Sequence, residues 1–468
     1  MNKAIDVELN VKPVFIQLVH TTPLEGPCQP GSKEEMGADV ERRMGREGIA
    51  AFDAKLKENT GSLVRVMEPT YLEWSEDWVL PEAQVRSVEP DIYEADLVAV
   101  SESGLPQLLA ATLAARYRRP IGMLGWVPSV DVAAYLRSRG YEGYGFMDYG
   151  HLRQGLALLQ VRKAFQRTRV PMVQEGTTGI TAGVVSAIDD MATLQPRYGV
   201  HTSYISASTL LRVYDDLDEE GLNSAELLTT QLMENAEAVH MSRENLLPSV
   251  RFYVAVRKAL ERYECNAFVI PCAEVCATRV LGPRRVMFCL AHSLLKDEGI
   301  PSACEGDTNV LMSIALLEYI SRKSAYMGNV LLPNPPQDNV IAVGHDIPGL
   351  RMKGLAGRDY PYQIKSFTFS GWGATLRYDF ARDVGDVVTL VRFDPTGSKV
   401  LAVRGEIVGC EGVTKEGCSL RAHVRVNDLR DFYVKSLDFG HHMAMAYGDY
   451  LAQVKELGKM MGFGVVEA

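Results

Sequence analysis

Two carboxylates, Glu305 and Asp307, are separated by a single glycine in the segment SACEGD at residues 302–307. In an extended backbone, residues two apart point to the same side, so both carboxylates can face one cation. Gly306 allows the sharp turn that a crowded site needs. Asp307 also suits the N-cap of a following helix, because its side chain can accept the first free N–H groups. Glu305 has no such capping role, which makes it the stronger candidate for metal binding or acid–base chemistry.

Four further groups could join these carboxylates. His441 and His442 form a pair in an apolar segment near the C-terminus, and a neutral imidazole is a common ligand for divalent metals. Glu274 and His345 each follow a predicted buried strand. Packing, capping or a salt bridge to a nearby arginine would explain each of them as simply. Together, two or three carboxylates and one histidine would form an oxygen-rich site suited to Mn²⁺ or Mg²⁺, whereas zinc favours more Cys or His ligands.

The first two thirds of the chain, which contain Glu274, Glu305 and Asp307, show alternating strand and helix patterns. Short apolar runs at residues 13–20, 62–69, 95–102 and 119–126 are typical of buried parallel strands, and helical patterns separate them. A longer helical pattern at residues 151–168 leads into a second set of strands and helices. This order predicts two α/β domains, each with an open, mostly parallel, doubly wound sheet.

In such domains, ligands bind at the C-terminal ends of the strands. Glu274 and the Glu305–Asp307 pair both follow strands of the second α/β domain, so we expect them at one sheet edge. Beyond residue 338, closely spaced strand patterns with Gly, Asp-Pro and Thr-Gly turns predict an antiparallel β-barrel-like domain that ends in a loop with His442 and a helix. The predicted domains are residues 1–168, 169–338 and 339–468.

The composition is that of an ordinary globular protein, since 47% of the 468 residues are hydrophobic and 23% are charged. The net charge of -10 and the lack of a Lys/Arg block argue against nucleic acid as a partner. The N-terminus has no signal-peptide pattern and no apolar run is long enough for a membrane span, so we expect a cytoplasmic protein whose eight cysteines are free thiols. Cys272 and Cys276 could form a metal or redox site, although packing is the commoner role.

The motifs of several large enzyme classes are missing. No G-x-G-x-x-G opens the first strand–helix turn and no G-x-x-x-x-G-K-[ST] occurs, so a cradle for nucleotide phosphates is absent. The sequence also lacks the G-x-S-x-G elbow of serine hydrolases. The chemistry that remains is that of carboxylates and histidines.

These residues and their order resemble the superfamily of L-fucose isomerase and L-arabinose isomerase. The resemblance rests on DEGIPSACEGDTNVLMSIALLEYI, on GHDIP after a strand, on GDVVTLVRFD and VRGEIVG in the β domain, and on FGHHMAMAYGDY near the C-terminus. It covers the chain from Asn266 onwards, while the N-terminal third agrees only in architecture. The resemblance implies two Rossmann-like domains, one β-barrel-like domain, and an aldose–ketose isomerase that uses Mn²⁺.

The site residues of the family carry over position by position. Glu305 matches the glutamate of the arabinose-type E-G-D motif, and Asp307 matches the ligand aspartate of the fucose-type segment. His442 matches a ligand histidine of the arabinose type, and Glu274 is the best match for an upstream acid. The resemblance thus implies Glu305, Asp307 and His442 as metal ligands, and Glu274 and Glu305 as the catalytic acid–base pair.

Two departures separate the chain from both named enzymes. The arabinose type has a further ligand histidine after the E-G-D glutamate, at a position that falls near Arg322 here. The upstream acid of the fucose type falls near Val286 or Met287, and neither side chain can serve. The chain therefore resembles the fucose isomerase-like branch of the superfamily.

The expected function is a metal-dependent aldose–ketose isomerase of carbohydrate metabolism that acts on a monosaccharide through an ene-diol. The family implies a homo-oligomer, a trimer or hexamer, with its active site near a subunit interface. A metal-dependent epimerase or lyase acting on a related sugar or sugar acid is the alternative, and a non-catalytic sugar-binding protein is the third reading. No nucleic-acid or membrane partner is expected.

Overall fold

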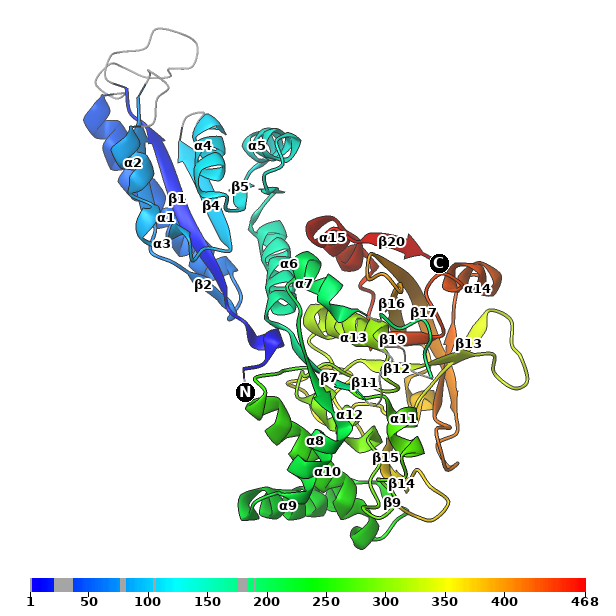
Figure 1. The fold of residues 1–468 in the computed structure, drawn as a ribbon. Coiled ribbons are helices and arrows are strands. Elements are labelled where there is room, and N and C mark those ends of the chain that lie inside the picture. Colours follow the sequence, from blue (N-terminus) through cyan, green and yellow to red (C-terminus); the bar gives the residue numbers. More distant parts are fainter. Residues whose placement is uncertain (1, 21–36, 76–80, 104–106, 175–182, 189) are drawn as a thin grey trace. The chain divides into compact units, whose positions relative to one another are not determined.

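In the computed structural model the chain forms two compact units. One runs from Val7 to Gln160, and the other joins the residues before Val7 to Val161–Ala468 (Figure 1). Among the described residues, no helix is long and apolar enough to cross a bilayer. The structure describes residues 2–20, 37–75, 81–103, 107–174, 183–188 and 190–468.

A parallel sheet forms the core of the N-terminal unit. Its strands are β1 (Leu9–Leu18), β2 (Val64–Val66), β3 (Thr70–Trp74), β4 (Leu97–Ser103), β5 (Ile121–Leu124) and β6 (Gly143–Phe146). Its helices are α1 (Ala38–Asn59), α2 (Glu82–Arg86), α3 (Glu89–Ile92), α4 (Gln107–Tyr117), α5 (Trp126–Ser138) and α6 (Tyr149–Arg167), which continues into the C-terminal unit. The strand order is β2-β1-β4-β5-β6, with β3 paired to the second half of β1. The four predicted strands are confirmed as β1, β2, β4 and β5, whereas β3 and β6 were not predicted.

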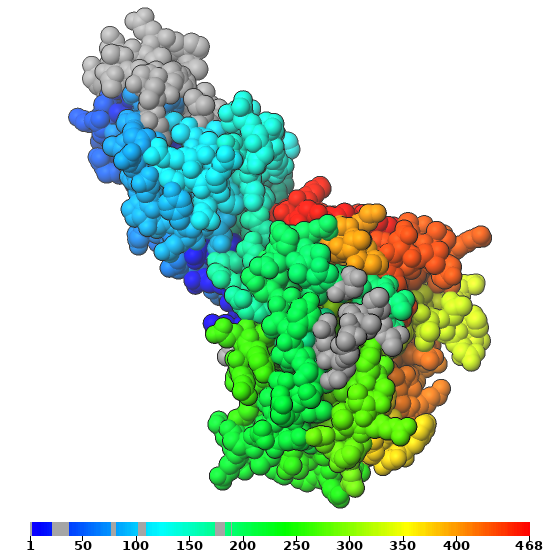
Figure 2. Space-filling view, viewed as in Figure 1, coloured from blue at the N-terminus to red at the C-terminus, as the bar shows by residue number. Residues whose placement is uncertain are grey.

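A second parallel sheet begins the C-terminal unit, in the order β11-β10-β7-β8. These strands are β7 (Arg169–Gln174), β8 (His201–Ser206), β10 (Phe268–Val269) and β11 (Ser302–Ala303). The helices around them are α7 (Leu194–Tyr198), α8 (Ala207–Asp215), α9 (Glu219–Asn235), α10 (Arg243–Arg262), α11 (Cys272–Ala277), α12 (Cys289–Asp297) and α13 (Thr308–Ser321). Helices α8, α9 and α10 supply much of the green surface of this unit in Figure 2. The two shortest strands, β10 and β11, lie next to each other and lead into the segments that contain the candidate acids.

Six antiparallel strands then close into a β-barrel near the C-terminus. They are β12 (Tyr326–Leu331), β13 (Val340–Gly344), β16 (Val387–Phe393), β17 (Lys399–Glu411), β18 (Arg421–Arg425) and β19 (His442–Tyr447). Pairing runs β16-β19-β12-β13-β18-β17, and the pairing of β16 with β17 closes the ring. Helix α13 is buried along most of its length and packs against β16 and β19, so it joins the sheet to the barrel. The chain ends with α14 (Leu429–Ser436), α15 (Leu451–Met461) and β20 (Gly464–Glu467).

Two details of the barrel differ from the expected layout. The barrel strand β12 lies on the N-terminal side of the boundary predicted at residue 338. The segments β14 (Gln363–Ser366) and β15 (Ala374–Arg377), expected among the barrel strands, form a separate small sheet with β9 (Ala238–Val239). Strand patterns report how a segment buries its side chains, but they do not identify its partner, which explains the second difference.

Candidate metal centre

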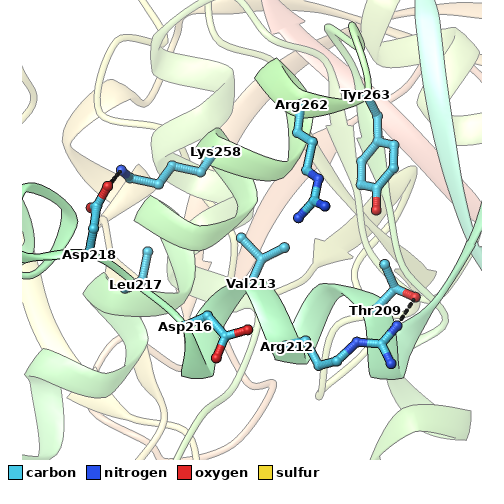
Figure 3. Close-up of a pocket in the computed structure, with 9 residues that line it drawn as sticks. All are labelled: Thr209, Arg212, Val213, Asp216, Leu217, Asp218, Lys258, Arg262 and Tyr263. Carbon is cyan, nitrogen blue, oxygen red and sulfur yellow. Dashed lines mark hydrogen bonds and ion pairs between the residues drawn. The ribbon is translucent and has the colours of Figure 1, made fainter.

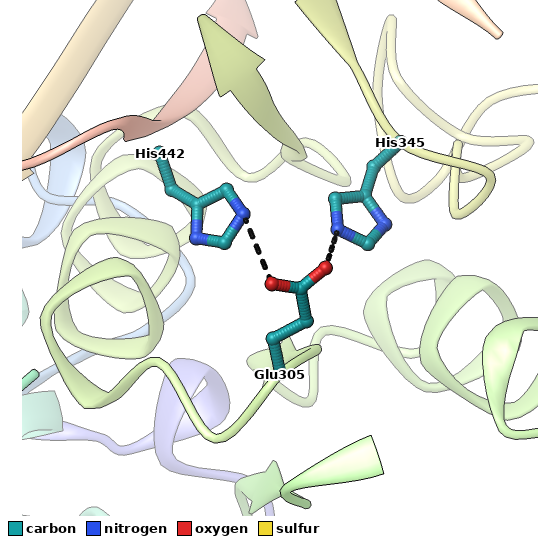
Figure 4. Close-up of side chains that lie close together, drawn as sticks. All are labelled: Glu305, His345 and His442. Carbon is teal, nitrogen blue, oxygen red and sulfur yellow. Dashed lines mark hydrogen bonds and ion pairs between the residues drawn. The ribbon is translucent and has the colours of Figure 1, made fainter. Parts of the chain in front are cut away.

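Three side chains from distant parts of the C-terminal unit converge on one point (Figure 4). Glu305 follows β11, His345 follows β13, and His442 begins β19. One ligand atom from each lies within 4.8 Å of the other two. His345 Nε2 is 3.1 Å from Glu305 Oε1, and His442 Nε2 is 3.7 Å from Glu305 Oε2. We call these three residues the Glu–His–His cluster.

The turn after β11 presents Glu305 to the histidines. Glu305 and Gly306 both adopt left-handed backbone conformations, with φ values of 57° and 68°. A residue with a β-carbon pays about 1 kcal/mol or more for this conformation, whereas glycine adopts it freely. The Gly306 amide donates to the Ile270 carbonyl at 2.9 Å, which ties the turn to the end of β10. The strained residue is thus the one whose carboxylate meets the histidines, as is common at functional sites.

Asp307 is completely buried and accepts three hydrogen bonds. Its Oδ1 accepts from the Val310 amide at 2.9 Å, which makes it the N-cap of α13. Its Oδ2 accepts from Arg392 Nη1 at 2.7 Å and lies 2.9 Å from His442 Nδ1. Burial raises the pKa of Asp307, but Arg392 and His442 outweigh it and hold that pKa below its ordinary value. The structure therefore places Asp307 behind His442, where it caps a helix and orients an imidazole, and outside the cluster itself.

His442 is fixed in one orientation by this carboxylate. Because the ionised Asp307 can only accept, His442 Nδ1 carries the proton and Nε2 presents a lone pair toward Glu305. Burial lowers the pKa of His442, against the raising effect of Asp307, so the ring stays neutral at pH 7. Nε2 is fully buried and has no hydrogen-bond partner among the described residues. Its sequence neighbour His441 is exposed and lies outside the cluster.

Arg392, which the sequence analysis did not single out, holds the carboxylate in place. Its side chain is completely buried on β16. Nε donates to the Phe439 carbonyl at 2.6 Å, and Nη1 donates to the His442 carbonyl at 3.1 Å as well as to Asp307. The sequence did contain a signal for this role, because Arg392 lies within the apolar run of a strand. A buried guanidinium requires an ionised partner, so this position predicts a buried carboxylate nearby.

His345, which the sequence analysis named as a further candidate but not among the expected metal ligands, lies within the cluster. Its ring is buried, with Nδ1 3.3 Å from Cys418 Sγ and Nε2 toward Glu305. Burial lowers the pKa of His345, but the Cys418 sulfur and the Glu305 carboxylate raise it to well above its ordinary value. Burial raises the pKa of Glu305. The hydrogen bond and the charge of His345 lower this pKa by more than burial raises it, so the pKa of Glu305 lies below its ordinary value. The two groups therefore favour an ion pair when no metal is bound.

The residues of the cluster fit a divalent transition metal. One carboxylate and two imidazoles are available, and the imidazole of His442 is oriented by a carboxylate behind it, as in many metal sites. The buried Nε2 lone pair of His442 has no other use among the described residues. This donor set is richer in nitrogen than the oxygen-rich site expected from the sequence, and it suits a divalent transition metal better than Mg²⁺.

Glu274, the predicted upstream acid, is not in the cluster. It lies on α11, which begins at Cys272 just after β10, and its side chain is partly buried. The first turn of α11 is close to the Glu305 turn, because Cys272 Sγ lies 3.6 Å from the Sγ of Cys304. As the strand ends predicted, α11 lies beside the Glu305 turn. The Glu274 carboxylate, however, is not part of the Glu–His–His cluster.

A small cavity of about 60 Å³ adjoins Glu305 and His345. Apart from these two residues, its wall is apolar or made of thiols. It is formed by Cys272, Met287, Phe288, Cys289, Cys304, Phe367 and Cys418. The cavity gives the cluster a face that is open to a small molecule and screened by sulfur and aromatic groups.

A larger surface pocket of about 320 Å³ lies between α8 and α10 (Figure 3). Two of its charged groups pair with each other, and Arg212 bonds to an uncharged neighbour. Lys258 Nζ donates to both carboxylate oxygens of Asp218 at 2.7 and 2.9 Å, and Arg212 Nη2 donates to Thr209 Oγ1 at 3.1 Å. Among the described residues, this pocket contains no group of metal-ligating side chains like the Glu–His–His cluster, which is therefore the stronger candidate despite its smaller cavity.

Metal selectivity tests the donor set directly. We expect the purified protein to bind Mn²⁺ at least about ten-fold more tightly than Mg²⁺, because imidazole nitrogens are poor ligands for Mg²⁺. His345→Gln is expected to remove most of this preference, while His423→Gln, which changes a barrel histidine outside the cluster, should keep it. Calorimetric titrations measure both affinities. Equal affinities for the two ions in the unchanged protein would contradict the nitrogen-containing site.

Proton release on metal binding provides a second test. Because the pKa of His345 is raised, the ring is protonated below that pKa and must lose its proton before Nε2 can bind a metal. The Mn²⁺ affinity should therefore rise with pH until His345 is neutral, and then level off. Titration calorimetry in two buffers of different ionisation enthalpy counts the protons released. Cys418→Ala removes one of the two groups that raise this pKa and should reduce the number of protons released, whereas an unchanged number would argue against the role of Cys418.

Comparisons with known proteins do not extend these findings. No protein-family model matches the sequence, and a search of curated proteins finds no match for it.

Proposed function

We propose that this protein is a metal-dependent aldose–ketose isomerase that acts on a monosaccharide. The observation that carries the proposal is the convergence of Glu305, His345 and His442 within 4.8 Å. Mn²⁺ is the proposed cofactor. The sequence resemblance to the fucose isomerase-like branch supports the reaction class, and the order of two parallel sheets and a barrel is compatible with it.

Aldose–ketose isomerisation moves a proton between C2 and C1 through an ene-diol. A bound Mn²⁺ would polarise the carbonyl and neighbouring hydroxyl oxygens and stabilise negative charge on them. The protein supplies the base and the acid, and we assign these roles to Glu305 and Glu274. The lowered pKa of Glu305 keeps it ionised at neutral pH, as a base or a ligand requires. Glu274, on the neighbouring α11, is the proposed partner that returns the proton.

The proposal includes several finer features of the family. These are doubly wound, Rossmann-like topology for both sheet domains, a cytoplasmic location, and a homo-oligomer of three or six chains. The size of the cavity supports the last of them. Small-molecule pockets usually measure about 300 Å³ or more, whereas the cavity at the cluster holds about 60 Å³. A monosaccharide therefore needs further walls, which a neighbouring subunit would supply.

A screen for ketose formation tests the proposed reaction. The protein is incubated with aldopentoses, 6-deoxyhexoses and acidic or sulfonated hexoses, with Mn²⁺ added or removed by a chelator. We expect one sugar class to yield ketose, with activity lost on chelation and restored by Mn²⁺. Ketose formation that persists in excess chelator would contradict the metal-dependent mechanism.

Two outcomes of the same screen would favour the alternatives. Loss of deuterium from a C2-labelled aldose without ketose formation would indicate an epimerase or lyase that uses the same carboxylates. Sugar binding that is insensitive to chelator, with no deuterium loss, would indicate a non-catalytic binding protein.

A further inference from the structure

We propose that Cys272 and Cys304 form an oxidation site, in which a hydroperoxide converts the two thiols to a disulfide and withdraws Glu305 from the histidines. The carrying observation is the distance of 3.6 Å between the two Sγ atoms. This is a van der Waals contact between sulfurs that belong to different segments. The proposal goes beyond the isomerase activity and depends only on the cluster as a metal site.

The sheet sets this contact. Strands β10 and β11 pair in parallel, with Val269 opposite Ala303. Cys304 directly follows β11, and Cys272 opens the helix that follows β10. The hydrogen bond from the Gly306 amide to the Ile270 carbonyl binds the two strand ends together. A disulfide has an S–S length of about 2.05 Å, so the sulfurs must approach by roughly 1.5 Å, which side-chain rotation and a small backbone shift can provide.

The cavity beside the cluster gives an oxidant access to the pair. Both Cys272 and Cys304 line it. Its volume of about 60 Å³ exceeds the roughly 10–15 Å³ that a cavity needs to hold one water molecule, so hydrogen peroxide fits. Cys272 is partly exposed, whereas Cys304 is 3% exposed. Cys272 is therefore the thiol that the peroxide meets first, and Cys304 is the resolving thiol.

The chemistry balances with hydrogen peroxide as the oxidant. The Cys272 sulfur attacks one peroxide oxygen, the O–O bond breaks, and a sulfenic acid and one water form. The Cys304 sulfur then attacks the Cys272 sulfur, the S–O bond breaks, and the disulfide and a second water form. Two electrons pass from the thiols to the peroxide, and both thiol protons end in water. A dithiol reductant reverses the reaction by exchange.

The position of Cys304 connects this oxidation to the metal site. Cys304 is bonded directly to Glu305 in the chain, and its amide donates to Met327 Sδ at 3.5 Å. Drawing its sulfur toward α11 shifts the turn on which Glu305 holds its left-handed conformation. Metal ligands must keep their distances to within a few tenths of an ångström. The oxidised protein should therefore bind Mn²⁺ more weakly.

Peptide mapping tests the disulfide without reference to any enzymatic activity. The full-length protein, freed of reductant, is treated with a few equivalents of hydrogen peroxide, blocked with N-ethylmaleimide and digested without reduction. We expect a cross-linked peptide pair that contains Cys272 and Cys304. Cys276→Ser, which removes the exposed thiol on the same short helix, should form the same cross-link, and Cys272→Ser should not. A disulfide to Cys418 or Cys289, or an overoxidised Cys272 beside a free Cys304, would overturn the proposal.

Mn²⁺ titration of the reduced and oxidised protein measures the consequence. We expect at least about a ten-fold loss of affinity on oxidation, full recovery with dithiothreitol, and no peroxide response in Cys272→Ser. An equal loss of affinity in Cys272→Ser would overturn the link between the disulfide and Glu305. A negative sugar screen would leave both measurements interpretable, so failure of the isomerase proposal and failure of the oxidation site can be told apart.

Discussion

Glu305→Gln is expected to weaken Mn²⁺ binding by about 100-fold or more and to lower ketose formation by roughly 10³-fold. The substitution keeps the size and the hydrogen-bonding reach of the side chain but removes the charge that faces His345 and His442. Electron paramagnetic resonance measures free Mn²⁺ during a titration, and ketose assays measure turnover. The free energy of unfolding of the metal-free protein should also fall, because the substitution removes the charge that pairs with the buried His345, so both measurements are made on variant protein shown to be folded.

Glu411→Gln provides the matched control for this result. The Glu411 side chain on β17 is about as exposed as that of Glu305, at 22% against 24%, and it also pairs with a cation, Arg421. It lies outside the cluster, so its variant should retain Mn²⁺ affinity and turnover. Near-normal binding and turnover in Glu305→Gln would remove Glu305 from the metal centre and with it the basis of the proposed reaction.

Arg392→Met is expected to destabilise the protein by about 3–5 kcal/mol, because it leaves the buried Asp307 carboxylate without its countercharge. Arg392 and Asp307 are both 0% exposed in their side chains, and the bond between them measures 2.7 Å. The same substitution frees the carboxylate that orients His442, so the Mn²⁺ affinity should fall as well. Guanidinium unfolding and a metal titration of the folded variant measure the two effects.

The exposed pair of Arg404 and Asp449 is the control, since its Nε–Oδ2 distance is 3.2 Å but both side chains are about half exposed. Arg404→Met should cost about 1 kcal/mol or less. The pH adds a sign. Because the folded pKa of Asp307 is lowered, its contribution to stability is complete above the unfolded pKa, near pH 4, and is lost as the pH falls through the folded pKa. If Arg392→Met costs no more than Arg404→Met, the buried pair does not stabilise this core.

The sequence predicted the overall fold because the relevant signals are local. Strand and helix periodicity over a few residues predicted the parallel strands β1, β2, β4 and β5, and turn residues predicted the antiparallel barrel. The partners of β14 and β15 could not be predicted in this way. They pair with each other, and β14 also pairs with β9 from a distant part of the chain. Nothing in the pattern of either strand distinguishes the barrel from this small sheet.

For the candidate site, too, the sequence predicted the features that depend on nearby residues and not those that depend on distant ones. The sequence by itself indicated that Glu305 lies at a strand end with no capping role, and that Asp307 suits a helix N-cap as well as a metal site, because both statements depend on residues nearby in the chain. Only the tertiary structure decided that His345 completes the cluster and that Asp307 lies behind His442. His345 is 40 residues from Glu305 in the chain. The position of Asp307 depends on Arg392, 85 residues away, and on His442, 135 residues away. The role of a carboxylate depends on the cation and the imidazole that it contacts, and only folding brings those groups within hydrogen-bond distance of Asp307.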